Sequence, residues 1–132
     1  MYYRTREGPI TASDSFTALT TLFGQSTTGS VQCPSQASAI VGIIASVATD
    51  SATNGATTFA CQLSGDGLSQ GQETLTVGSQ GVDGTPASNG SCDLPFSLSV
   101  NIPVVGSNQV SIAGAMSTDV GSAEMSVCLV FA

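Results

Sequence analysis

Apolar and polar residues alternate along the stretch FSLSVNIPV, residues 96–104, so that every second residue is apolar. Because the side chains of a β-strand point alternately to its two faces, this pattern predicts a strand with one buried face and one solvated face. Pro103 falls on the polar parity and has no backbone N–H to donate. We therefore expect this end of the strand at a sheet edge or at a bulge.

Two later segments, 110–113 and 124–131, repeat the alternation. The stretches between the three segments, at 106–108 and 118–122, contain the Gly, Asn and Asp residues that tight chain reversals favour. The last third of the chain is therefore predicted to be a three-stranded antiparallel meander.

Upstream segments fit the same architecture. Residues 57–63 and 73–77 alternate, and residues 39–47 are apolar at both parities, as expected of a central strand that is covered on both faces. Residues 14–23 fit either a helix, through an apolar stripe closed by Gly24, or a strand, which the threonines favour, and we predict a strand. The chain is thus predicted to be all-β: an antiparallel two-sheet β-sandwich, jelly-roll-like, with about seven or eight short strands.

Charged residues make up only 8% of the 132 residues, while hydrophobic residues make up 41%. A chain of this length fits one domain with a real core, and its exterior must be built from hydroxyl groups and glycine more than from charge. The net charge of −7 argues against nucleic-acid binding by the main body and against an anionic membrane as partner. The longest apolar run, 39–48, is about half the ~20 residues of a membrane-spanning helix, and we expect no secretory signal.

The four cysteines, Cys33, Cys61, Cys92 and Cys128, include no C-x-x-C pair, so a structural zinc site has little support. We predict two disulfides, with buried free thiols as the alternative. Cys33 and Cys92 lie in turn-like sequence, whereas Cys61 and Cys128 lie within strand patterns. This context favours a pair between Cys33 and Cys92 and a pair between Cys61 and Cys128.

One stretch resembles a catalytic motif. GLSQG, residues 67–71, matches the G-x-S-x-G turn of α/β-hydrolases, in which Ser69 would be the nucleophile. Such a serine needs a general base, usually histidine, and the chain contains no histidine and no lysine. We therefore predict a glycine-rich hairpin turn here, and a chain that is not an enzyme and has no cofactor.

Loop residues offer two further candidate sites. The loop carboxylates, which could bind calcium between subunits, are Asp50, Asp66, Asp83 and Asp119. None has the spacing of a calcium-binding hand, and Asp-Gly pairs commonly serve turns, so we predict no metal site. Asn89, in the sequence Asn-Gly-Ser, is a candidate glycosylation site.

Both arginines and both tyrosines of the chain lie in its first six residues, MYYRTR. Met, Tyr and Arg are enriched at protein interfaces, and the rest of the chain has few of them. We therefore predict a docking arm over residues 1–9 and a β-sandwich domain over residues 10–132, with a frayed terminus as the alternative to the arm. The arginines would pair with carboxylates of a neighbouring subunit. The predicted interface residues are Tyr2, Tyr3, Arg4 and Arg6.

The hydroxyl-coated, weakly charged sandwich pattern over residues 16–131, together with a terminal arm, resembles single jelly-roll subunits of viral shells and their decoration proteins. The resemblance implies a structural subunit of a virion that forms symmetric homo-oligomers, such as a trimer-based lattice. It also implies partners among copies of itself and other shell proteins, and no cofactor. The acidic body departs from capsid proteins that package a genome through a basic arm, and it fits an outer-shell position better. A secreted filament subunit, adhesin or carbohydrate-binding module, with an extracellular location, is the alternative.

Overall fold

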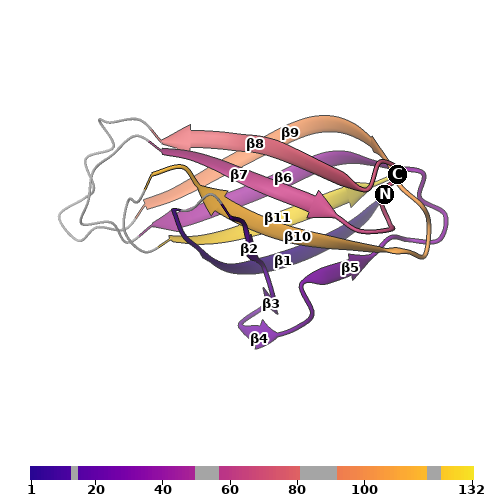
Figure 1. The fold of residues 1–132 in the computed structure, drawn as a ribbon, viewed down its shortest axis with the longest axis horizontal. Coiled ribbons are helices and arrows are strands. Elements are labelled where there is room, and N and C mark those ends of the chain that lie inside the picture. Colours follow the sequence, from indigo (N-terminus) through magenta and orange to yellow (C-terminus); the bar gives the residue numbers. More distant parts are fainter. Residues whose placement is uncertain (13–14, 50–56, 81–91, 119–122) are drawn as a thin grey trace.

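The computed structural model describes residues 1–12, 15–49, 57–80, 92–118 and 123–132. These residues form eleven β-strands and no helix. The strands make two antiparallel sheets that pack face to face, as Figure 1 shows. The predicted all-β, two-sheet sandwich is therefore confirmed.

The two sheets have six and five strands. The first sheet, in spatial order, contains β4 (Gln25–Ser26), β3 (Thr21–Leu22), β1 (Tyr2–Ile10), β11 (Ala123–Phe131), β6 (Ala39–Thr49) and β9 (Cys92–Pro103). The second contains β2 (Thr17–Ala18), β10 (Gln109–Met116), β7 (Thr57–Ser64) and β8 (Gln72–Gln80), with β5 (Ser30–Gln32) paired to β10 beside β2.

The strand pairs are nested along the chain. β7 pairs with β8, β6 with β9, β5 with β10 and β1 with β11, so the first half of the chain folds back along the second half. If β2 and β5 are taken as one interrupted strand, and the hairpin of β3 and β4 inserted between them is left aside, eight strands result, which agrees with the predicted seven or eight. A folded-back chain of eight strands divided between two sheets is the jelly-roll arrangement.

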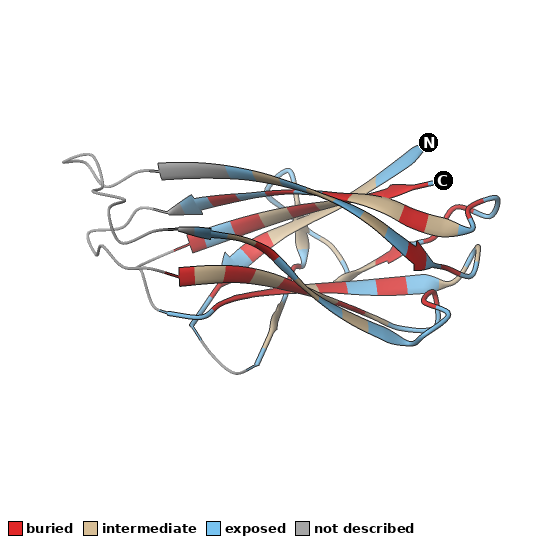
Figure 2. Cartoon of the chain, turned by 90° about the horizontal axis from the view of Figure 1, so that it is seen from above, coloured by how far each residue is buried: buried red, intermediate tan, exposed pale blue. Residues whose placement is uncertain are grey.

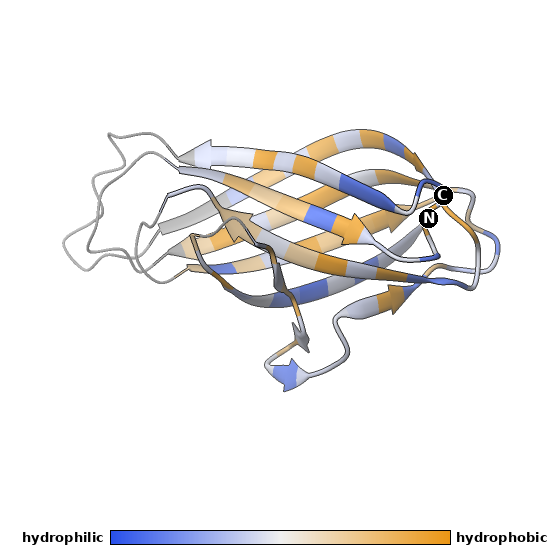
Figure 3. Ribbon diagram, viewed as in Figure 1, coloured by the Kyte–Doolittle hydropathy of each residue, from blue (hydrophilic) through white to orange (hydrophobic). Residues whose placement is uncertain are grey.

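The core lies between the sheets because burial alternates along the long strands (Figure 2). In β7, Phe59, Cys61 and Leu63 are fully buried, while the residues between them are half-exposed. In β11, Met125 and Val127 are buried, and the residues on either side of them are more exposed. Figure 3 shows the matching alternation of hydrophobic and hydrophilic residues along these strands. Period-two patterning therefore determines which face of each sheet enters the core.

β6 has the predicted central position, between β11 and β9, but only one of its faces is covered. Ile43 and Val47 are fully buried, whereas Ile44, on the opposite parity, is 51% exposed. The prediction that this strand is covered on both faces is therefore wrong for the single chain. The reason is that both sheets turn one face to solvent, and none of the described residues forms a further layer outside the first sheet.

β9 is the edge strand of the first sheet, which agrees with the position predicted from Pro103. The register between β6 and β9 shifts between Ile40 and Gly42, close to this end of the strand. Pro95 is a second residue of β9 without an N–H, and prolines within strands are confined to edges and bulges. Such residues disfavour the addition of another strand at this edge.

Residues 17–32 form an interrupted strand with a hairpin inserted into it. The N–H of Leu19 donates to the carbonyl of Ile112 at 3.0 Å, and the N–H of Ile112 donates to the carbonyl of Gly29 at 3.0 Å, so the strand resumes where it left β10. Between these points, β3 and β4 form a two-stranded hairpin whose first strand joins the edge of β1. The strand prediction for 14–23 is confirmed for its described residues, in two short pieces.

The turn of this hairpin carries a strained phenylalanine. Phe23 and Gly24 both have positive φ angles, 52° and 74°, as a two-residue turn of type I′ requires. A non-glycine residue in this conformation is uncommon, and the Phe23 side chain is 87% exposed. The hairpin projects from the body of the sandwich in Figure 1.

Gly78 of β8 lies directly under the ring of Phe96 of β9, on the side of the sandwich where both strands are edges. The Phe96 ring also contacts Phe59, with ring centroids 5.9 Å apart. A methyl group at position 78 would overlap the Phe96 ring, so this ring and its contact with Phe59 would have to move.

We therefore expect Gly78→Ala to lower the free energy of unfolding by about 1–3 kcal/mol, the usual cost of overpacking. Urea unfolding, followed by circular dichroism, measures this free energy. Gly42→Ala is the matched control, because a methyl group at that strand glycine meets its nearest atoms at 3.6 Å, an ordinary contact. Equal stability of the two variants would contradict the packing described here.

Candidate functional site

The first residues of the chain are part of the sheet. β1 pairs with β11 along its whole length, from Tyr2 opposite Phe131 to Ile10 opposite Ala123. The predicted division into an arm over 1–9 and a domain over 10–132 therefore does not match the structure. The charges that suggested an arm lie on a strand, where Arg4 and Arg6 share the parity of the buried residues Gly8 and Ile10.

Arg6 is held within its own chain. Its Nε donates to the carbonyl of Thr28 at 2.9 Å, its Nη2 to the carbonyl of Ser30 at 2.9 Å, and its Nη1 to the carbonyl of Thr5 at 2.8 Å. The guanidinium thus ties β1 of the first sheet to the start of β5 in the second. It is a structural residue, in contrast to the predicted pairing with a neighbour's carboxylate.

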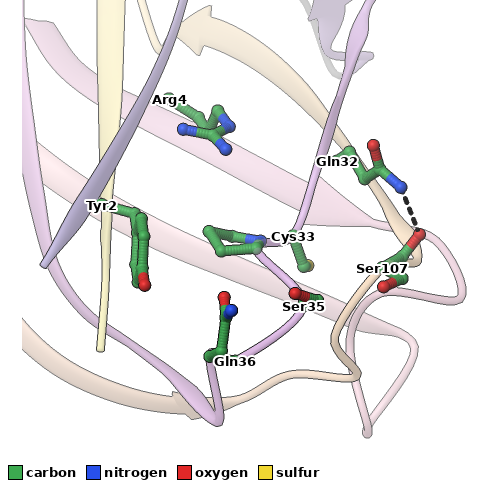
Figure 4. A pocket seen from close by; sticks show the side chains of 8 residues that line it. Tyr2, Arg4, Gln32, Cys33, Ser35, Gln36 and Ser107 are labelled. Atoms are coloured by element: carbon green, nitrogen blue, oxygen red, sulfur yellow. Dashed lines mark hydrogen bonds between the residues drawn. The ribbon is translucent and has the colours of Figure 1, made fainter.

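Arg4 and Tyr2 line a pocket of about 340 Å³. Its lining includes Tyr2, next to the first residue, and Figure 1 marks both chain ends at the same end of the sandwich. Figure 4 shows Tyr2 and Arg4 projecting from β1, opposite Gln32 and Ser107. The lining residues are Tyr2, Arg4, Gln32, Cys33, Pro34, Ser35, Gln36 and Ser107.

The polar groups of this pocket are mostly neutral. Gln32 Nε2 donates to the carbonyl of Ser107 at 3.0 Å and so fixes one wall. Arg4 Nη1 donates to the carbonyl of its neighbour Tyr3 at 3.0 Å, and no described carboxylate forms an ion pair with the Arg4 guanidinium. The pocket therefore combines one unpaired positive charge with amide and hydroxyl groups.

Cys33 contributes a buried thiol to the same pocket. Burial raises the pKa of this thiol, and the nearby Asp66 carboxylate raises it further, while a backbone hydrogen bond and Arg4 act in the opposite direction. Its Sγ lies 3.8 Å from the carbonyl oxygen of Gly67. A thiol with a raised pKa stays protonated at neutral pH, so Cys33 lacks the thiolate that a cysteine nucleophile needs.

The structure differs from the predicted disulfides, because Cys33, Cys61 and Cys128 are free thiols. Cys61 points into the core, whereas Cys128 lies on the opposite parity to the buried residues of β11 and faces outwards. Cys33 contacts the loop that follows β9, through bonds with Ser107 and Asn108. Cys92 begins β9, a strand of 12 residues, and is therefore roughly 35 Å from that loop at ~3.3 Å per residue.

We expect the three thiols to react at different rates, with Cys128 far ahead of Cys33 and Cys61 at pH 8. Burial raises the pKa of Cys61 from 9.0 to about 12. Alkylation followed by peptide mapping measures the reaction rate of each thiol. Because the folded pKa lies above the unfolded one, the neutral Cys61 thiol contributes stability below pH 9 that is lost as the pH rises towards 12. Modification of native Cys61 as fast as of Cys128 would contradict this burial.

The GLSQG stretch is a turn between two strands. Residues 65–71 connect β7 to β8, the N–H of Ser69 donates to the carbonyl of Pro103 at 3.1 Å, and Gly71 has a φ of 82°. A strand follows the motif, whereas a hydrolase elbow needs a helix there. The predicted hairpin turn is therefore confirmed.

Asp66, in the same turn, accepts a hydrogen bond from the N–H of Gln109 through Oδ1 at 3.3 Å, which is a turn-forming role. Among the described residues, no group of three or more His, Cys, Asp or Glu side chains is placed to hold a metal ion. Asp50, Asp83, Asp119 and Asn89 lie outside the described residues.

The outer face of the first sheet carries a second candidate feature, an apolar patch. Tyr3 lies opposite Val130, and Cys128 lies opposite Ile44, so the four residues share one face across β1, β11 and β6. Tyr3 is 56% exposed, Ile44 is 51% exposed and Cys128 is partly exposed, whereas Val130 is only 7% exposed. We call these four residues the outer patch; the sequence indicated it only through the doubly apolar pattern of residues 39–47.

The sequence did not predict the remaining pocket residues, because residues 32–36 and 107 come next to β1 only through strand pairing.

No described segment forms an apolar helix of membrane-spanning length. No known family model matches the chain, and no curated protein does.

Proposed function

We propose that this chain is a structural subunit that assembles with copies of itself through the outer face of the first sheet, as a coat or decoration protein of a virion. One observation carries the proposal: β6 has the sequence of a strand buried on both faces, yet Ile44 on its outer face is exposed in the single chain. A second copy packed on this face would cover it.

The chemistry of the face favours such packing. Burying a side chain such as isoleucine is worth about 1.5–3 kcal/mol, and large aromatic residues such as Tyr3 are enriched at interface centres. The outer patch contains no charged residue, and Glu7 and Glu124 lie further along the same face. Two copies could therefore meet over the patch without burying an unpaired carboxylate, which would be costly.

The jelly-roll arrangement supports a role in a viral shell, because this fold recurs in capsid proteins, although it also occurs in lectins and cupins. The second candidate function is a secreted binding module, an adhesin or carbohydrate-binding domain. The observation that favours it is the polar pocket, whose lining includes the Tyr2 ring and the amides of Gln32 and Gln36.

Sedimentation velocity over a hundredfold range of concentration, with negative-stain microscopy at the top of the range, tests the assembly. We expect species larger than the 13.1 kDa monomer that grow with concentration. We also expect Cys128, which lies in the outer patch, to be alkylated more slowly in the assembled fraction. A chain that stays monomeric throughout would overturn the proposal.

A further inference from the structure

We propose that the pocket around Arg4 is a carboxylate-binding site, and that in the assembly its ligand is an acidic side chain of a second copy of this chain. The second part rests on the proposed function; the first part does not. Arg4 is the side-chain cation that the fold leaves unpaired among the described residues, since Arg6 is held by three carbonyls.

The guanidinium of Arg4 has donors to spare. One Nη1 bond goes to the carbonyl of Tyr3, and no described residue bonds to the edge formed by Nε and Nη2. This edge carries two parallel N–H groups, whose spacing matches the two oxygens of a carboxylate. Because Arg4 is half-buried, such a pair would be less screened by water than one on the open surface.

The other lining groups suit a carboxylate that enters the pocket. The hydroxyls of Tyr2 and Ser35 and the amide of Gln36 can each donate a hydrogen bond, and the buried Cys33 thiol is neutral. The volume of about 340 Å³ admits an aspartate or glutamate side chain. A phosphate dianion fits less well, because one cation would face two charges inside a chain of net charge −7.

Composition identifies the source of the carboxylate. Each copy carries nine Asp and Glu residues but only two arginines and no lysine. Copies of such a chain repel each other unless a cation lies at the contact. Arg4 is the described side-chain cation that is free to serve such a contact. It lies on the strand that carries Tyr3 but on the opposite face, so the contact at the pocket is separate from the contact at the outer patch.

Acetate is the probe for the pocket itself. We expect acetate, titrated to about 100 mM into the ¹⁵N-labelled chain at constant ionic strength, to shift the side-chain Nε–H resonance of Arg4. It should also shift the backbone amides of the pocket wall, which are those of Gln32, Cys33, Ser35 and Gln36. Acetamide, which has the same shape without the charge, should shift neither. Arg4→Gln should abolish the acetate shifts, because glutamine can still reach the carbonyl of Tyr3 but carries no charge. Equal shifts with acetamide, or unchanged acetate shifts in Arg4→Gln, would overturn the site.

Measurements of self-assembly test whether the carboxylate comes from a second copy of the chain. We expect Arg4→Gln to raise the dissociation constant of the assembly about tenfold, the effect of losing one partly buried ion pair. Sodium acetate should weaken assembly of the intact chain more than sodium chloride does, and should have no such extra effect on Arg4→Gln. If Arg4→Gln assembles like the intact chain, a second copy is not the ligand, although the proposed function survives. If the intact chain never assembles but binds acetate through Arg4, the proposed function fails and the carboxylate site stands.

Discussion

Ile44→Asp leaves the chain folded and raises the dissociation constant of its self-association at least about a hundredfold, at 1.4 kcal/mol per tenfold. The side chain is 51% exposed in the single chain, so an aspartate there remains solvated and costs the monomer little. In an assembly that covers the outer patch, the same carboxylate would be buried without a partner. Breaking the apolar contact and burying an unpaired charge both act against association.

Sedimentation velocity measures the association, and circular dichroism checks the fold. Val105→Asp is the matched control, because Val105 is an aliphatic residue of similar exposure, 43%, that follows β9 outside the patch. Both variants have the same net charge, so general repulsion between copies affects them equally. If Ile44→Asp assembles as well as Val105→Asp, the outer patch is not the contact surface.

The second large effect concerns the connection between the sheets. We expect Arg6→Gln to lower the free energy of unfolding by about 2–4 kcal/mol. Hydrogen bonds to charged groups are worth about 1.5–3 kcal/mol each, and partial exposure keeps the total below their sum. Glutamine is too short to reach the carbonyls of Thr28 and Ser30 together, so β1 would lose its link to β5.

Arg4→Gln provides the control for charge and residue type. Its single hydrogen bond within the described residues goes to the adjacent carbonyl of Tyr3, so we expect a change of less than about 1 kcal/mol. Urea unfolding of both variants gives the comparison at low protein concentration. Equal losses at the two positions would show that the three bonds of Arg6 do not stabilise the packing of the sheets.

Alternation in the sequence was sufficient to predict the sandwich, because burial follows strand parity along most of β7, β10 and β11, with Ala115 and Val130 as exceptions. Parity could also have excluded the pair between Cys61 and Cys128. Cys61 shares the parity of Phe59 and Leu63, whereas Cys128 lies on the parity opposite to Leu129. The two thiols must therefore lie on different sides of the first sheet. The disulfide prediction failed because it relied on context and ignored this constraint.

The role of the first residues could not be predicted from composition. Two arginines on the inner parity of a strand are unusual. They are tolerated here because Arg6 donates to the carbonyls of Thr28 and Ser30, and because Arg4 lines an open pocket. The pocket could not be predicted from the sequence for a related reason. Its residues come from segments about 30 and 100 positions apart, and they meet only after β1 has paired with β11 and β5 with β10.

The position of β11 between β1 and β6 has a consequence for biosynthesis. During translation, residues 2–10 emerge early, but they have no complete partner strand until residue 131 has left the ribosome. The patch formed by Tyr3, Ile44, Cys128 and Val130 is therefore incomplete until β11 has been synthesised and has left the ribosome. If copies assemble as proposed, chains that still lack β11 would be unable to associate through this patch.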